Sequence, residues 1–190
     1  MKKLKVIELF AGVGGFRLGL EGDINGNSSS SNYTKKLKSN YKIVWSNQWE
    51  PSSRVQHANK VYENYWKKNN HNGDDINKVA NPEFSNKKVD TNIPDHELLV
   101  GGFPCQDFSL SGKHNGFSSH KTHDNKFVKN GKIPAYLSRG SLYLWMRKVI
   151  EITRPKVFIA ENVDSIKYFK GANDKIVKDL NKMANSGYEI

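Results

Sequence analysis

One cysteine occurs among the 190 residues, within the segment GGFPCQDFS at residues 101–109. It follows an apolar run, two glycines and a proline, and this context places Cys105 at the end of a strand, where other molecules can reach it. A thiolate is a strong nucleophile, and cationic neighbours such as Lys113 favour the thiolate form. The alternative is a buried structural cysteine, which is the usual role of a lone one. We interpret Cys105 as a candidate nucleophile.

A carboxylate ends another apolar run. Glu161 follows the residues KVFIA and belongs to the segment AENV at residues 160–163. Partial desolvation at the end of a buried strand suits a carboxyl group to proton donation. The alternative is that Glu161, or the amide of Asn162, only bonds to backbone amides nearby. We interpret Glu161 as a candidate proton donor.

A glycine-rich turn, FAGVGG at residues 10–15, follows the first apolar run of the chain. Gly12, Gly14 and Gly15 let the backbone turn sharply and approach a ligand closely. The pattern is neither the dinucleotide-binding glycine motif nor a phosphate-binding loop. A plain strand-to-helix turn therefore remains the alternative to a ligand site.

Polar and aromatic side chains gather in the segment SNQWEP at residues 46–51. A polar or acidic group after the second strand commonly bonds the hydroxyls of a ribose, and Gln48 and Glu50 are candidates for that role. Trp49 is suited to packing on an adenine ring. The alternative for Glu50 is a place at the positive end of a helix dipole.

These residues need strands and helices to position them, and the pattern of the chain predicts both. Apolar runs predict strands at 4–10, 42–47, 74–79, 96–103 and 156–163, with a sixth beginning at 188–190. Amphipathic stretches predict one helix that begins at 16–20 and three further helices over 52–68, 141–153 and 174–187. The alternation indicates an α/β fold with a mostly parallel sheet. Ligands of such sheets bind outside the carboxyl ends of the strands, where all four chemical segments fall, so we expect one active site.

Composition limits the partners and the compartment. Thirty Lys and Arg against nineteen Asp and Glu give a net charge of +11, which favours nucleic acid as a partner. A single cysteine fits a reducing compartment, and no apolar run is long enough to span a membrane, so we expect a cytoplasmic protein. The polar stretches at 21–42 and 111–140 predict flexible surface loops.

Three strings resemble a known enzyme family. FAGVGGFRLGL, GGFPCQDFSLSG and AENV, in this order, closely resemble motifs one, four and six of the bacterial-type DNA (cytosine-5)-methyltransferases. DDINKV and RGSLY resemble the third and fifth motifs of the same family. The resemblance implies a Rossmann-like, S-adenosylmethionine-dependent methyltransferase fold, with a twisted, mostly parallel sheet and helices on both faces. It also implies a modification enzyme of a restriction-modification system that acts on double-stranded DNA.

The resemblance also implies roles for individual residues. Cys105 would add to carbon 6 of a cytosine that is flipped out of the duplex, and Glu161 would hydrogen-bond or protonate the ring at N3. Carbon 5 would then take the methyl group of S-adenosylmethionine, leaving S-adenosylhomocysteine. No metal is implied. The residues implied in cofactor binding are Phe10, Gly12, Gly14, Gly15, Gln48, Trp49, Asp75, Ile76, Pro104 and Leu142.

The chain departs from the family pattern in three respects. Gln48 stands where the family usually has Glu, the loop after Cys105 is longer than in compact members, and the sequence stops before motif eight, the target recognition domain and the last strands. We therefore expect residues 1–190 to be the N-terminal cofactor-binding and catalytic part of a methyltransferase, truncated before the last strands. Alternatives are an incomplete subunit or relic that acts only with a complementary chain, and a tRNA cytosine methyltransferase, which the string FPCQDF disfavours.

Overall fold

The computed structural model describes residues 2–25, 38–50, 54–67, 70–80, 93–104, 142–168, 172–181 and 188. The chain falls into two compact units. The first comprises Met1–Gly102 and Thr153–Ala160, and the second comprises Phe103–Ile152 and Glu161–Ile190. Among the helices in these described ranges, none has the length and apolar character needed to cross a membrane.

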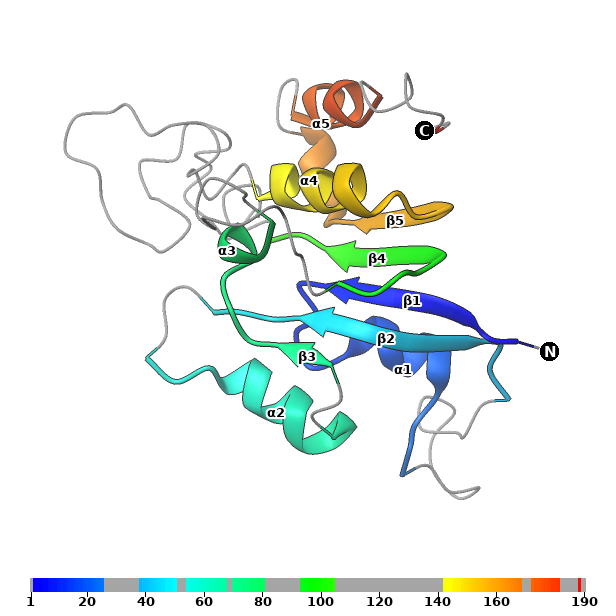
Figure 1. The fold of residues 1–190 in the computed structure, drawn as a ribbon. Helices are drawn as coiled ribbons and strands as arrows, with labels where there is room; N and C mark the ends of the chain where they lie inside the picture. Colours follow the sequence, from blue (N-terminus) through cyan, green and yellow to red (C-terminus); the bar gives the residue numbers. More distant parts are fainter. Residues whose placement is uncertain are drawn as a thin grey trace. The chain divides into compact units, whose positions relative to one another are not determined.

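Within the described residues, a five-stranded sheet forms the centre of the first unit, and only the last residue of β5 belongs to the second unit (Figure 1). Its strands are β1 (Leu4–Leu9), β2 (Tyr41–Asn47), β3 (His71–Asn72), β4 (Leu98–Gly102) and β5 (Val157–Glu161), in the spatial order β3-β2-β1-β4-β5. The pairs β1–β2, β1–β4 and β2–β3 are parallel. The chain runs outward from β1 in one direction to β2 and β3 and then in the other to β4, so the topological switch point lies between β1 and β4. The predicted parallel α/β fold is confirmed.

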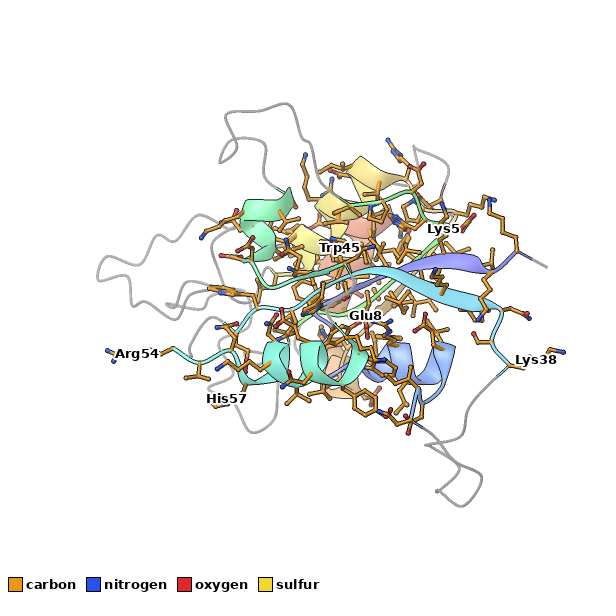
Figure 2. All side chains as sticks on the ribbon, turned by 60° about the horizontal axis from the view of Figure 1, so that its bottom comes forward. Lys5, Glu8, Lys38, Trp45, Arg54 and His57 are labelled. Carbon is orange, nitrogen blue, oxygen red and sulfur yellow. The ribbon has the colours of Figure 1, made fainter. Side chains whose placement is uncertain are left out.

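In the described part of the first unit, the helices α1 (Gly15–Glu21), α2 (His57–Trp66) and α3 (Ile76–Ala80) accompany the sheet. Figure 2 shows α1 and α2 on one face of the sheet and α3 on the other. On the first face, Phe16 and Leu20 of α1 pack against a buried cluster that includes Val6 of β1. Because side chains alternate along a strand, Glu8 faces the same helices as Val6. An acidic residue thus lies among apolar ones beneath α1 and α2.

The strand β5 is the outermost strand of the sheet on the β4 side within the described residues. Its side chains are largely exposed, and Val157 and Ile159 keep 55% and 46% of their surface accessible. These two residues lie two apart and so share one face of the strand. An edge strand with exposed apolar side chains is a surface that favours association with further polypeptide.

The second unit contains α4 (Tyr143–Thr153, whose last residue belongs to the first unit), a short 3-10 helix (Asp164–Tyr168) and α5 (Ala172–Asn181). The helix predicted at 141–153 is confirmed, and its apolar side is buried at Tyr143, Trp145, Met146, Val149 and Ile150. The hydroxyl of Tyr143 donates a hydrogen bond of 2.7 Å to the carboxylate of Asp179 on α5, which joins the two helices.

Two predicted elements are wrong in part. Residues 74–79 do not form a strand, because β3 comprises only His71–Asn72 and α3 begins at Ile76. The carboxylate of Asp75 accepts the backbone N–H of Asn77 at 3.0 Å, and its carbonyl accepts that of Lys78 at 2.9 Å. An Asp that satisfies the free N–H groups of a helix start favours the helix over a strand.

The helix predicted at 52–68 begins later, at His57. The side-chain amide of Gln56 bonds both backbone groups of Glu50, accepting from its N–H at 2.6 Å and donating to its carbonyl at 2.7 Å. These bonds fix the ends of the segment 50–56 outside the helix. The predicted loop at 111–140, the end of the helix at 182–187 and the strand at 189–190 lie outside the described residues, as does most of the loop at 21–42.

Candidate active site

Three of the predicted segments meet at the carboxyl ends of β1, β2 and β3 in the first unit. The glycine turn joins the end of β2, because the N–H of Ala11 donates to the carbonyl of Asn47 at 3.0 Å. The end of β2 joins the segment after β3, because the N–H of Gln48 donates to the carbonyl of Asn72 at 3.1 Å. The side-chain amide of Asn47 also donates to the carbonyl of Asp74 at 2.8 Å. Main-chain and side-chain bonds therefore hold the three segments together.

The glycine turn combines an open side with a filled side. Gly12 has a φ of +56°, and a Cβ atom at Gly12 or at Gly15 would meet no heavy atom within 4 Å. Gly14 has a φ of +97°, and a Cβ there would lie 2.2 Å from Nε1 of Trp66. Phe10 also has a positive φ, +53°, which is uncommon for a residue other than glycine. The turn thus packs against α2 through Gly14 and leaves space at Gly12 and Gly15.

Trp66 fixes the position of this turn. Its indole N–H donates a hydrogen bond of 3.1 Å to the carbonyl of Val13. The guanidinium of Arg17 lies 4.9 Å from the centroid of the Trp66 rings, a cation–π distance. The helix predicted at 52–68 includes Trp66, but the sequence pattern assigned that residue no part in the site. The indole N–H of a buried tryptophan needs an acceptor, and this requirement could have indicated a contact with a backbone carbonyl nearby.

The polar candidates after β2 divide into two roles. The side-chain oxygen of Gln48 accepts the N–H of Gly12 at 2.8 Å, so Gln48 lies against the glycine turn. Glu50 instead accepts the N–H of Ala58 at 2.9 Å, at the start of α2. This contact supports the alternative reading of Glu50, in which its carboxylate lies at the positive end of a helix dipole. Trp49 lies between Gln48 and Glu50 in the sequence, and its side chain is partly exposed.

Asp75 and Ile76 close the third side of this group. Both are buried, with 8% and 4% of their surface exposed. Asp75 follows the segment that Asn47 braces, and its carboxylate caps the start of α3. Asp75, Gln48 and the glycine turn therefore come from three neighbouring strand ends of the same unit.

A buried acid–phenol pair lies behind the glycine turn. Glu8 is fully buried, and the hydroxyl of Tyr62 donates to its carboxylate at 3.1 Å (Figure 2 labels Glu8 between the strands and α2). The backbone N–H of Arg17, in the first turns of α1, donates to the other carboxylate oxygen at 3.3 Å. The Tyr62 ring stacks on His71 with 4.2 Å between centroids. This cluster ties β1, α1, α2 and β3 together directly behind the turn.

Burial controls the ionisation of this pair. It raises the pKa of Glu8 from 4.5 to about 7, and the hydrogen bond from Tyr62 opposes the shift. Burial, with the charge of Glu8 beside it, raises the pKa of Tyr62 to about 12. The sequence showed Glu8 only as one polar residue in an apolar run. An acidic residue within a predicted central strand indicates that its side chain faces a polar partner.

We expect the stability of the chain to depend on the protonation of Glu8. Between pH 4.5 and about 7 the folded chain holds a proton that the unfolded chain has released, so stability falls as the pH rises through this window. The loss is on the order of 3 kcal/mol and is complete above about pH 7. Glu8→Gln, which is neutral at every pH, should remove this dependence. Urea unfolding of both proteins at several pH values measures it, and two curves that stay parallel from pH 5 to pH 8 would contradict it.

The second unit contains the other predicted site residues that the structure describes. The side-chain amide of Asn162 donates to the carbonyl of Phe103 at 3.0 Å, so the residues after β4 and after β5 are joined there. Pro104 is partly buried and Leu142 is buried. Asn162 was read from the sequence only as a backbone-bonding alternative to Glu161, and the structure gives it that role. Cys105 lies outside the described residues.

Glu161 is the last residue of β5. It is exposed rather than partly desolvated, so the expected burial is not present in the described residues. The reason is its place on the outermost strand, where β4 is the only neighbour in the described sheet. The same carboxylate would become less exposed if further polypeptide covered β5.

Comparison with known proteins identifies the family. The family model for C-5 cytosine-specific DNA methylase matches residues 4–190. The chain belongs to this family. The type II methyltransferase M.Sau3AI of Staphylococcus aureus is 37% identical over 87% of the chain, and M.HaeII of Haemophilus aegyptius is 31% identical over 99%. M.HhaI of Haemophilus parahaemolyticus is 33% identical over 93%.

These relatives are longer than the present chain. The aligned part of the chain corresponds to 32% of M.Sau3AI, 44% of M.HaeII and 39% of M.HhaI. The methylase family match therefore concerns a segment that is less than half of each of these relatives. The family resemblance drawn from the three motif strings is confirmed.

Proposed function

We propose that this chain is the cofactor-binding and catalytic part of a DNA cytosine-5 methyltransferase, the modification enzyme of a restriction-modification system. The observation that carries the proposal is the methylase family match over residues 4–190. The geometry supports it, because the glycine turn, Gln48 and Asp75 gather at the carboxyl edge of a parallel sheet. Ligands bind at that edge in folds of this class.

The residues at this edge fit an S-adenosyl cofactor. The space over Gly12 and Gly15 is open to a ligand, and the turn beneath it is fixed by Trp66. Gln48 offers a neutral amide for a ribose and Trp49 an aromatic face for adenine, and Asp75 and Ile76 would flank the adenine. In this proposal Phe10 and Gly14 shape the turn. The family resemblance also implies a cofactor-binding role for Pro104 and Leu142, which belong to the second unit. S-adenosylmethionine bound there would supply an electrophilic methyl group and would leave as S-adenosylhomocysteine.

The chain's own residues would activate the cytosine. The thiolate of Cys105 forms a bond to carbon 6 of a flipped cytosine, and Glu161 donates a hydrogen bond or a proton to N3. These two steps convert carbon 5 into an enamine carbon that can take a methyl group. Loss of the proton from carbon 5 and of the thiolate from carbon 6 then restores the aromatic ring. The bond from Asn162 to the Phe103 carbonyl supports this assignment, because it joins the segments that carry the two residues.

Double-stranded DNA is the proposed substrate. The net charge of +11 suits contact with phosphates, and a base inside a duplex must be flipped out before a thiolate can reach it. We also propose that the activity requires polypeptide equivalent to the rest of the longer relatives, either in the same protein or in a complementary chain. Reading of the target sequence would belong to that part.

A pair of leucine substitutions tests the cofactor site. Gly15 and Gly19 both lie in α1, and a Cβ at either position would meet no heavy atom within 4 Å. Gly15→Leu should fill the space over the turn and weaken S-adenosylhomocysteine binding by roughly tenfold or more. Gly19→Leu should leave binding unchanged, because it lies one turn further along the helix. Both variants should fold at least as stably as the parent, since Leu favours helix over Gly.

Isothermal titration calorimetry of the two variants and the parent gives the three affinities directly. Thermal unfolding of the same samples checks that each variant is folded. Equal affinities for all three proteins would contradict the proposed position of the cofactor over the glycine turn.

A further inference from the structure

The side chain of Gln48 has a fixed orientation. Its Oε1 atom accepts the backbone N–H of Gly12 at 2.8 Å. A backbone N–H can only donate, so the atom that faces it must be the amide oxygen and not the nitrogen. The Nε2 group is therefore the end that faces away from Gly12. Among the described residues, none forms a hydrogen bond with Nε2, and Gln48 is partly exposed.

The surroundings of Gln48 keep it in this orientation. Its own backbone N–H is bonded to Asn72, and the preceding residue, Asn47, accepts the N–H of Ala11. The strand end is thus held on both sides. The glycine turn is held from its other side by Trp66, which bonds the carbonyl of Val13. Reversing the amide of Gln48 would place two N–H donors against the donor of Gly12, which costs a hydrogen bond and adds repulsion.

We propose that Gln48 binds the ribose of the cofactor as a hydrogen-bond donor, through Nε2, while its oxygen braces the glycine turn. This inference rests on the proposed cofactor site. A carboxylate in the same place could only accept, and a ribose hydroxyl would then have to donate. An amide donor requires only an acceptor atom on the sugar. The site therefore recognises the ribose oxygens as hydrogen-bond acceptors. A ligand whose sugar cannot donate a hydrogen bond at the contacted position should still bind.

Fluorinated ligands test this polarity. The probes are S-adenosylhomocysteine and its analogues in which fluorine replaces the 2′-hydroxyl or the 3′-hydroxyl. Fluorine is close in size to hydroxyl, cannot donate a hydrogen bond and can weakly accept one. The parent chain is compared with Gln48→Glu, in which Oε1 can still accept the N–H of Gly12 and the second oxygen is an acceptor. Affinities come from isothermal titration calorimetry.

For the analogue that replaces the contacted hydroxyl, we expect the parent to lose about threefold or less in affinity and Gln48→Glu to lose about tenfold or more. Comparing the two losses cancels any effect of fluorine on the sugar itself. A loss in the parent that equals or exceeds the loss in Gln48→Glu, for both analogues, would overturn the proposal. Failure of both proteins to bind S-adenosylhomocysteine itself would instead refute the cofactor site, and the inference with it.

A second measurement follows the bracing bond without any ligand. In Gln48→Met the side chain can no longer accept the N–H of Gly12, so that amide should exchange with solvent at least about tenfold faster than in the parent. In Gln48→Glu the bond remains, and exchange should stay close to the parent rate. An unchanged Gly12 exchange rate in Gln48→Met would show that the amide oxygen is not engaged, and would overturn the assignment of Nε2 as the donor to the ribose.

Discussion

Replacing Cys105 with serine is expected to lower the rate of methyl transfer by roughly a thousandfold or more. Serine occupies similar space, but its hydroxyl is a far weaker nucleophile than a thiolate near neutral pH. Because the proposed cofactor contacts of Gln48 and the glycine turn do not involve the sulfur, binding of S-adenosylhomocysteine should change by less than about twofold. The rate is measured with methyl-labelled S-adenosylmethionine and duplex DNA in the active enzyme that contains this chain.

The companion variant Asn162→Ala separates positioning from chemistry. It removes the donor to the Phe103 carbonyl and leaves the sulfur intact, so it should slow transfer less than Cys105→Ser does. If transfer in Cys105→Ser stayed within about tenfold of the parent rate, Cys105 would not be the nucleophile.

The second large effect concerns the chain by itself. We expect no detectable methyl transfer from the 190-residue chain alone, and restored transfer when a segment equivalent to the remainder of its relatives is supplied. The chain matches 32% to 44% of the relatives named above, and β5 exposes Val157 and Ile159 on its surface. Exposed apolar side chains on an edge strand suit the docking of such a segment.

The natural supplement for this experiment is the C-terminal part of the 37% identical Staphylococcus aureus relative. The chain alone should still bind duplex DNA without sequence preference, and this binding should weaken steeply with salt, because Lys and Arg contacts to phosphates suffice for it. Robust, sequence-specific transfer by the 190-residue chain without any supplement would refute the need for further polypeptide.

The sequence was sufficient for the parts of the fold that depend on long apolar runs. The strands at Leu4–Leu9 and Leu98–Gly102 and the helix at Tyr143–Thr153 have strong periodicity and appear where the pattern predicts them. The third strand was misplaced because it is only two residues long, His71–Asn72, and polar throughout. Local patterns carry little information about so short a strand, whose pairing depends on the tertiary contact with β2.

The candidate site was predictable as a set of segments but not as a set of bonds. The glycines and polar residues at strand ends were evident from the sequence, whereas the bond from Gly12 to Gln48 joins residues 36 apart in the chain. The capping role of Glu50 and the burial of Glu8 likewise depend on α2, through Ala58 and Tyr62. Such roles follow from packing between elements, which a single sequence does not display.

The position of the transferred methyl group tests the central claim most directly. The active enzyme that contains this chain is incubated with methyl-labelled S-adenosylmethionine and duplex DNA, and the DNA is digested to nucleosides and separated. We predict that the label appears in 5-methylcytosine and that Cys105→Ser abolishes it. Label in an adenine or on the exocyclic nitrogen of cytosine, with none at carbon 5, would contradict the proposed function.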